Sequence, residues 1–319
     1  MKPAQNFRIA TRSSELALRQ ARLVAERLLA IGITSELVTY KTTGDKNLSE
    51  PLSGIGAKGL FTKELEDDLA QGNVECCVHS LKDLPTVMPD GLELGATLER
   101  EDPRDVLIVN HLVGADTIAT LPRGSRVGTS SLRRRAQLLA ARGDLEVVEL
   151  RGNVPTRVRK VDDGQVHAAI LAAAGLHLLI IVQRIAAYLD APAWLPAAGQ
   201  GAIAVQVRAD DANTRRIVAT MHHPDTGIET RAERAFLAAL DGGCQVPIGA
   251  LAMMDGVPTL HGFISDVDGR QNIRGSVDLD RANPERSGIA LAQRLRSRGA
   301  TEILAALRAV VKVPSPQPE

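Results

Sequence analysis

The sequence predicts an α/β protein with two doubly wound domains and a smaller α+β domain at the C-terminal end. Short apolar runs alternate with helical patterns over most of the chain, and this alternation stops near residue 224. Of the 319 residues, 44% are apolar, enough for a large core in two or three domains. The alternation favours parallel sheets, whose ligands bind at the carboxyl ends of the strands.

Eight apolar runs are expected to be strands buried on both faces: FRIAT, TSELVTY, VECCVHS, DVLIV, SRVGTS, LEVVEL, HAAILAA and GAIAVQV. Helical spacing gives one apolar face to Leu16, Leu23, Val24, Leu28 and Ile31, and another to Phe61, Leu65 and Leu69. After residue 224, HGFISDVDGRQNIRGSV predicts two strands around an Asp268-Gly269 turn, with a helical stretch on either side.

Composition excludes several classes of protein. Lys+Arg and Asp+Glu are both 38 and aromatic residues are 2%, so neither the charge nor the stacking surface of a nucleic-acid binder is present. The start, MKPAQNFRIATR, lacks the apolar stretch of a signal peptide, and no run reaches the roughly 18 apolar residues of a membrane span. We therefore expect a cytoplasmic protein that binds neither nucleic acid nor membrane.

The cysteines predict neither a disulfide framework nor a metal site. There are three, and their spacing forms no CxxC pair and no Cys/His zinc pattern. Cys76 and Cys77 lie in an apolar run, which favours buried thiols. Cys244 lies in DGGCQVPIG, where Gly-Gly and Val-Pro predict an irregular loop, so its thiol is expected to reach solvent or a ligand.

Arginines occur at predicted helix starts, where the partial positive charge of the helix disfavours them. They flank capping residues at three strand-to-helix turns, in TRSSELAL, TSSLRRRAQ and RGNVPTRVRK, and are Arg12, Arg133, Arg134, Arg135, Arg151 and Arg157. This repetition predicts a site for a multiply charged anion. The alternative, that these side chains are solvated or paired with surface carboxylates, stays open. Consecutive helical residues lie about 100° apart, so the three successive arginines cannot all face one ligand.

A candidate acid follows one of the strands. In VHSLKDLPTVMP, Asp83 comes at the carboxyl end of a predicted strand, beside Ser80 and Lys82, which suits a general acid or a group that stabilises a cation. An ordinary surface pair of Lys82 and Asp83 is the alternative. GIGAKG matches GxGxxG, but no strand precedes it, so a loop containing Lys58 that covers the crevice is favoured over a nicotinamide site.

Together these motifs resemble the porphobilinogen deaminase (hydroxymethylbilane synthase) family. Eight segments occur in that family's order and span nearly the whole chain: RIATRSSELALRQA, GAKGLFTKELE, VHSLKDLP, EREDPRD, VGTSSLRRRAQL, LRGNVPTR, LPAAGQGA and GGCQVPIG. The resemblance implies two periplasmic-binding-protein-like domains, at residues 1–100 with 200–220 and at 101–199, and a third domain at 221–319 that carries Cys244.

The resemblance also implies a transferase of tetrapyrrole and heme biosynthesis. Cys244 would hold a dipyrromethane cofactor through a thioether. Porphobilinogen would lose ammonia to give an azafulvene, the anchored chain would attack it, and hydrolysis after four additions would release hydroxymethylbilane. A monomer is expected, and transfer of the product to uroporphyrinogen III synthase stays open. A non-catalytic anion receptor of the same fold is the alternative, although such receptors are exported and need no fixed thiol.

Individual roles follow from the same resemblance. Asp83 is implied as the catalytic residue and Lys58 as part of a lid loop. The implied cofactor contacts are Lys82, Asp83, Thr129, Ser130, Arg133, Arg134 and Arg157. The implied substrate contacts are Arg12, Ser14, Ser80, Arg151 and Arg157.

The chain departs from the family at one position. After LAAAGL the family has a basic residue and then an arginine that contacts pyrrole carboxylates, whereas this chain has His177 and Leu178. Either the site binds its ligands less tightly, or another arginine, Arg135 or Arg184, fills the gap.

Overall fold

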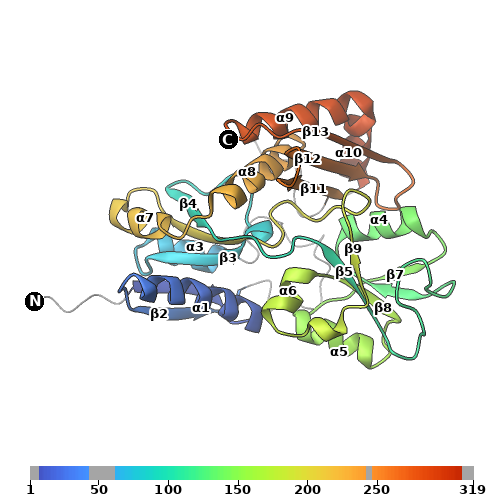
Figure 1. The fold of residues 1–319 in the computed structure, drawn as a ribbon, viewed down its shortest axis with the longest axis horizontal. Coiled ribbons are helices and arrows are strands. Elements are labelled where there is room, and N and C mark those ends of the chain that lie inside the picture. The colour runs from blue at the N-terminus through green and yellow to red at the C-terminus, as the bar shows by residue number, and fades with distance from the viewer. Residues whose placement is uncertain (1–6, 43–61, 242–245, 311–319) are drawn as a thin grey trace, which may run out of the picture.

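The computed structural model describes residues 7–42, 62–241 and 246–310. They form two five-stranded sheets and one three-stranded sheet. Figure 1 shows two α/β lobes side by side and a third part above them. We call these the first lobe (described residues of 7–97, with 203–219), the second lobe (105–189) and the third lobe (described residues of 224–310).

The first lobe has the strand order β2-β1-β3-β10-β4. Side chains alternate between the two faces of each strand, so Ile9 and Cys76 pack against α1 and α7, whereas Ala10 and Cys77 pack against α3. Its elements are β1 (Phe7–Arg12), α1 (Glu15–Ala30), β2 (Ser35–Tyr40), α3 (Lys63–Ala70), β3 (Cys76–Ser80), a 3-10 turn (Leu81–Asp83), β4 (Leu92–Thr97), β10 (Ile203–Arg208) and α7 (Ala212–Ala219).

The second lobe has the strand order β7-β6-β8-β5-β9. Leu107 packs on the α4 side of this sheet and Ile108 on the side of α5 and α6. Its elements are β5 (Asp105–Val109), β6 (Arg126–Gly128), α4 (Leu132–Ala141), β7 (Glu146–Val148), α5 (Val154–Asp162), β8 (Ala168–Ala172), α6 (Ala173–Leu178), a 3-10 turn (Val182–Arg184) and β9 (Ala187–Leu189).

Both large sheets are mixed, so the expectation of parallel sheets is wrong. β10 runs antiparallel to β3 and β4, and β5 runs antiparallel to β8 and β9. Each is the first strand after the chain crosses from one lobe to the other. Because the crossing chain arrives at the edge where the neighbouring strands end, it enters the sheet in the opposite direction. An apolar run buried on both faces carries no information about this direction.

The two chain segments that cross between the lobes pair with each other through backbone hydrogen bonds. The Leu98 N–H donates to the Ile203 carbonyl and the Glu101 N–H to the Gly201 carbonyl, both at 3.0 Å. Gly201 has a φ of +89°, and a Cβ there would lie 2.3 Å from the Glu101 carbonyl oxygen. Only glycine fits this approach of two backbones, which brings the 3-10 turn after β3 close to the start of β5.

The third lobe is an antiparallel sheet, β11-β12-β13, covered by helices. Its elements are α8 (Pro224–Ala239), β11 (Ile248–Met253), β12 (Thr259–Ser265), β13 (Asn272–Asp278), α9 (Pro284–Leu295) and α10 (Thr301–Val310). The predicted turn joins β12 to β13, and Gly269 in it has a φ of +73°. A Cβ at Gly269 would lie 2.2 Å from the Ala136 carbonyl oxygen, because this turn packs directly on α4 (Figure 1).

All eight apolar runs contain strands, and the two strands around Asp268-Gly269 are confirmed. Three strands were not predicted: β4 contains a glycine, β9 has only three residues, and β11 follows a Val-Pro pair. Ile31 is 48% exposed rather than buried, because it caps the end of α1. Cys76 and Cys77 are buried, as expected. Phe61 and the GIGAKG segment lie outside the described residues. No helix in the described part of the chain is both long and apolar enough to span a membrane.

Candidate active site

A cavity of about 90 Å³ lies between the carboxyl ends of β3 and β8, one strand from each lobe. This is the edge at which open α/β sheets bind ligands. Four of the predicted site residues line it, and two glutamines join them: Ser80, Lys82, Arg134, Arg157, Gln20 and Gln200. Three of the six side chains are cationic, so the cavity suits an anion.

The first lobe contributes the end of β3 and the 3-10 turn after it. The Ser80 hydroxyl bonds to the Gln20 amide at 2.9 Å, and the Lys82 ammonium donates to Gln200 Oε1 at 3.3 Å. Burial lowers the pKa of Lys82 to about 8, while the negative charge of Asp83 opposes the shift. Asp83 is the last residue of the turn, and its side chain is exposed.

The second lobe contributes the start of α4. Ser131 caps this helix by accepting the Arg134 N–H, which fixes the first turn. Arg133 and Arg134 are 5% and 6% exposed, and both guanidinium groups donate to the buried carboxylate of Asp105. Burial acts to raise the pKa of Asp105, but the charges of Arg133 and Arg134 hold it well below its usual range. Arg134 lines the cavity, whereas Arg133 is not among the residues that do.

The first turn of α5 contributes Arg157. Asn153 caps α5 by accepting the Thr156 N–H at 2.9 Å, and Arg157 Nε donates to the Gly152 carbonyl at 2.7 Å. Burial, followed by the charge of Arg134, lowers the pKa of Arg157 to about 10, and Asp83 opposes this shift. The Arg157 guanidinium therefore lies within electrostatic reach of both Arg134 and Asp83.

Other predicted site residues lie at the turns around this cavity without lining it. Ser14 Oγ accepts the Ala17 N–H at 3.3 Å as the cap of α1. Thr129 Oγ1 accepts the Ser131 N–H at 3.2 Å, and the Ser130 hydroxyl donates to the Leu150 carbonyl at 2.9 Å.

Arg12 is half-buried at the end of β1, and Arg151 is half-buried with its Nε 3.9 Å from a Glu149 carboxylate oxygen. Cys244 and Lys58 lie outside the described residues.

Leu178 lines the cavity beside these cations. Neither arginine that could replace the missing charge reaches it. Arg135 donates to the Asp268 carboxylate at 2.9 Å, in the third lobe, and Arg184 is bonded to the Asp162 carboxylate. The expectation that Arg135 or Arg184 moves into the gap is therefore wrong.

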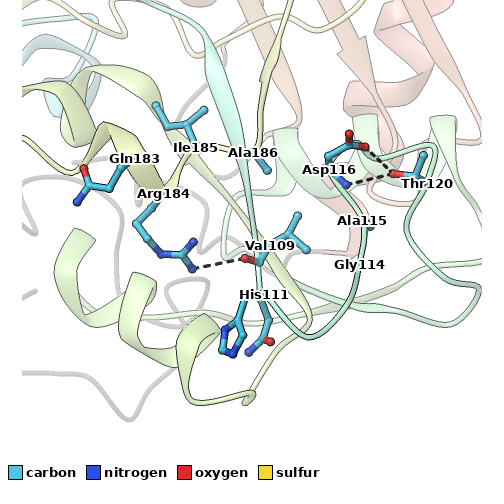
Figure 2. Close-up of a pocket in the computed structure, with 11 residues that line it drawn as sticks. Val109, His111, Gly114, Ala115, Asp116, Thr120, Gln183, Arg184, Ile185 and Ala186 are labelled. Atoms are coloured by element: carbon cyan, nitrogen blue, oxygen red, sulfur yellow. Dashed lines mark hydrogen bonds between the residues drawn. The ribbon is translucent and has the colours of Figure 1, made fainter.

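A larger hollow of about 390 Å³ lies at the opposite edge of the second-lobe sheet. Figure 2 shows Arg184 beside it, donating to the Val109 carbonyl at 3.4 Å. Val109 pairs with Ala168, the first residue of β8, so this hollow is at the edge where β8 begins. No predicted site residue in the described chain lines it, and we place the candidate active site at the smaller cavity.

Sequence reasoning missed three polar residues of this site: Gln20, Asp105 and Gln200. Gln20 lies on α1 and Gln200 on the crossing that precedes β10, so their approach to Lys82 and Ser80 depends on the tertiary fold. Asp105 lies in EREDPRD, one of the family segments, but its arginine partners are 28 and 29 residues away. All three residues lie in family segments, which were the signal in the sequence that could have identified them.

Two family models match this chain. One, "Porphobilinogen deaminase, dipyromethane cofactor binding domain", matches residues 7–216, and the other, "Porphobilinogen deaminase, C-terminal domain", matches residues 228–297. The chain belongs to the porphobilinogen deaminase family. This confirms the resemblance found in the sequence and excludes the alternative of a non-catalytic anion receptor.

Curated members of the porphobilinogen deaminase family align over almost their full length. The porphobilinogen deaminase of Moorella thermoacetica is 49% identical over 306 residues, covering 95% of this chain and 97% of the relative. That of Syntrophobacter fumaroxidans is 47% identical over 301 residues, covering 93% and 96%. Among solved structures, the methionine-binding protein MetQ is 13% identical with a TM-score of 0.43, over 74% of this chain and 94% of that one.

Proposed function

We propose that this chain makes hydroxymethylbilane from four molecules of porphobilinogen. They are added head-to-tail to a dipyrromethane primer that Cys244 holds through a thioether, and hydrolysis releases the product. Membership of the family gives porphobilinogen deaminase activity, a transferase reaction of tetrapyrrole biosynthesis, and a dipyrromethane-binding domain. The observation that supports the residue assignments is the cluster of cations at the facing ends of β3 and β8.

The residues present suit a dipyrromethane chemically. Each pyrrole carries an acetate and a propionate, so the group needs several cations and polar donors. Arg133 and Arg134 share one internal carboxylate, Asp105, which leaves a positive charge in excess, and Lys82 and Arg157 add two more. The residues that would hold the group are Lys82, Asp83, Thr129, Ser130, Arg133, Arg134 and Arg157. When bound, it supplies the pyrrole carbon to which porphobilinogen is added.

For porphobilinogen itself, we assign carboxylate binding and orientation to Arg12, Ser14, Ser80, Arg151 and Arg157. Asp83 is the catalytic residue: its carboxylate accepts the pyrrole N–H and stabilises the cation that forms as the amine leaves. The exposed position of Asp83 after β3, with Lys82 and Arg157 nearby, supports this role.

The organisation of the protein follows from the same proposal. Residues 1–100 with 200–220 form the domain of the catalytic aspartate, 101–199 the arginine-rich domain, and 221–319 the domain that carries Cys244. We assign Lys58, which lies outside the described residues, to a lid loop, as the family resemblance implies. We place the enzyme in the cytoplasm as a monomer, and transfer of its product to uroporphyrinogen III synthase stays open.

The intact mass of the purified protein tests the anchor. We expect the wild-type mass to exceed that of the polypeptide by one dipyrromethane, and Cys244→Ser to lose this excess together with activity. Cys77→Ser is the matched control, because that thiol is buried, donates only to the Leu65 carbonyl, and should leave the excess mass in place. A bare polypeptide mass in a fully active preparation would contradict the assignment.

Replacing Leu178 with Arg should tighten ligand binding, because it restores a cation on the α6 side of the cavity, which Arg135 and Arg184 do not reach. A hydrogen bond to a charged group contributes about 1.5 to 3 kcal/mol, or roughly one to two orders of magnitude in affinity. We expect a lower apparent KM for porphobilinogen, or fewer enzyme-bound intermediates by mass spectrometry. Val182→Arg adds the same charge at an exposed site outside the cavity and should change neither. An unchanged KM and intermediate pattern in folded Leu178→Arg would show that binding is not weakened.

A further inference from the structure

Asp105 is a buried carboxylate that four side chains bond at once. It is the first residue of β5 and is 0% exposed. Its Oδ2 accepts from Arg133 at 2.6 Å and from the Trp194 indole at 2.8 Å. Its Oδ1 accepts from Arg134 at 2.7 Å and from the Gln200 amide at 2.8 Å. Every donor is within ordinary hydrogen-bond distance, so the carboxylate has one defined orientation.

The donors to Asp105 come from two separate parts of the chain. Arg133 and Arg134 lie in the first turn of α4, whereas Trp194 and Gln200 lie on the crossing from β9 to β10. Gln200 also accepts from the Lys82 ammonium at 3.3 Å. A continuous chain of hydrogen bonds therefore runs from the arginines of the second lobe through Asp105 to the lysine of the first.

Backbone carbonyls complete the positioning of both guanidinium groups. Arg133 Nη1 donates to the Leu195 carbonyl at 2.7 Å, and Arg134 Nη1 donates to the Ile170 carbonyl at 3.0 Å. Arg133 Nη1 thus donates both to a carbonyl and to Asp105, whereas Arg134 uses Nη1 for a carbonyl and Nε and Nη2 for Asp105. A guanidinium has five N–H donors, and Arg134 keeps donors beyond these contacts while it borders the cavity.

The net charge of Asp105 and its two arginines determines which ligand this cluster can bind. A buried carboxylate between two guanidinium groups offsets one positive charge and leaves the other for an incoming anion. Since a charge-assisted hydrogen bond is strongly directional, arginines that are already oriented bind a carboxylate with less ordering cost. Without Asp105, two buried cations would repel each other and turn away.

We propose that Asp105 is a positioning residue of the anion site, which orients Arg133 and Arg134 for the carboxylates of the pyrrole chain and joins them through Gln200 to Lys82. The inference rests on the proposed function. If that function were wrong, the wild-type protein would lack the excess mass on Cys244 and the synthesis of hydroxymethylbilane; if only this inference is wrong, the wild type is loaded and active.

The test compares Asp105→Asn with Asp268→Asn in the enzyme loaded with its cofactor. Asn keeps the size of the side chain but loses the charge and turns an N–H₂ toward donors. We expect the apparent KM for porphobilinogen to rise at least tenfold, with a smaller fall in kcat and a lower loaded fraction by intact mass. Asp268→Asn removes the partner of Arg135 on the outer side of the same helix and should leave KM unchanged.

A spectroscopic measurement separates positioning from mere folding. The chain has one tryptophan, so its emission reports on Trp194 beside Asp105. Porphobilinogen should shift this emission in the wild type and in Asp268→Asn but not in Asp105→Asn. If Asp105 served only to stabilise the fold, Asp105→Asn would lower the stability of the protein and leave the KM of its folded fraction normal.

Folded Asp105→Asn with a normal KM and a normal emission shift would overturn the proposal. If Asp105→Asn does not fold, Trp194→Phe removes one neutral hydrogen bond from the same carboxylate and keeps both arginines. Its KM is then expected to rise at least twofold, and an unchanged KM would overturn the proposal equally.

Discussion

Replacing Asp83 with Ala is expected to lower kcat by about two to four orders of magnitude, the usual contribution of a positioned acid or base. The carboxylate is proposed to stabilise a cation that exists only along the reaction path, so KM should change much less than kcat. Asp83 is exposed at the end of its turn, so the free energy of unfolding should barely change. Steady-state kinetics and a denaturant titration of the same preparation measure both quantities.

Asp90→Ala is the matched control for Asp83→Ala. Asp90 is another exposed aspartate of the first lobe, in the turn before β4, and does not border the cavity. Its kcat should equal that of the wild type. Near-normal turnover of Asp83→Ala, or a defect explained entirely by unfolding, would remove Asp83 from the catalytic role.

The arginines show what local rules can and cannot predict. Their positions at helix starts predicted an anion site, because the helix charge disfavours them there. The rule could not show that Arg133 and Arg134 pair with a carboxylate of the protein itself. Asp105 approaches α4 only when β5 joins the second sheet. The spacing of about 100° between helical residues predicted that three successive arginines cannot face one ligand, and the Arg135 side chain indeed bonds to Asp268 instead.

The sheets likewise show which features of the fold local sequence patterns can and cannot predict. Apolar runs located eight strands, because short apolar segments have a clear sequence pattern. The expected burial on both faces is wrong for β2 and β7, which lie at sheet edges and contain no buried residue. The direction of β5 and β10 has no such pattern: it depends on which edge the chain reaches after each crossing between lobes. That crossing also brings Gln200 to Lys82, so the error in strand direction and the missed glutamine have one cause.

Replacing Glu233 with Ala is expected to destabilise the protein by about 3 to 5 kcal/mol, the range for breaking a buried ion pair. Glu233 is 0% exposed and pairs with Arg100 at 2.7 Å, joining α8 of the third lobe to the crossing between the other two. It also accepts the N–H groups of Gly199 and Ala252, at 2.7 and 2.9 Å. The variant therefore leaves the buried Arg100 guanidinium with one carboxylate, Glu229, beside its bond to the Gln200 carbonyl, and leaves two backbone N–H groups without their acceptor.

Denaturant unfolding measures this loss, with Glu285→Ala as the control. Glu285 forms an exposed pair with Arg231 at 3.5 Å, also on the third lobe, and such pairs contribute about 0 to 1 kcal/mol. Because Glu233 lies outside the cavity, the fraction of Glu233→Ala that remains folded should keep a normal KM for porphobilinogen. A loss below about 1 kcal/mol would show that water or Glu229 replaces the pair, and an altered KM in folded protein would show that the third lobe controls the geometry of the site through this contact.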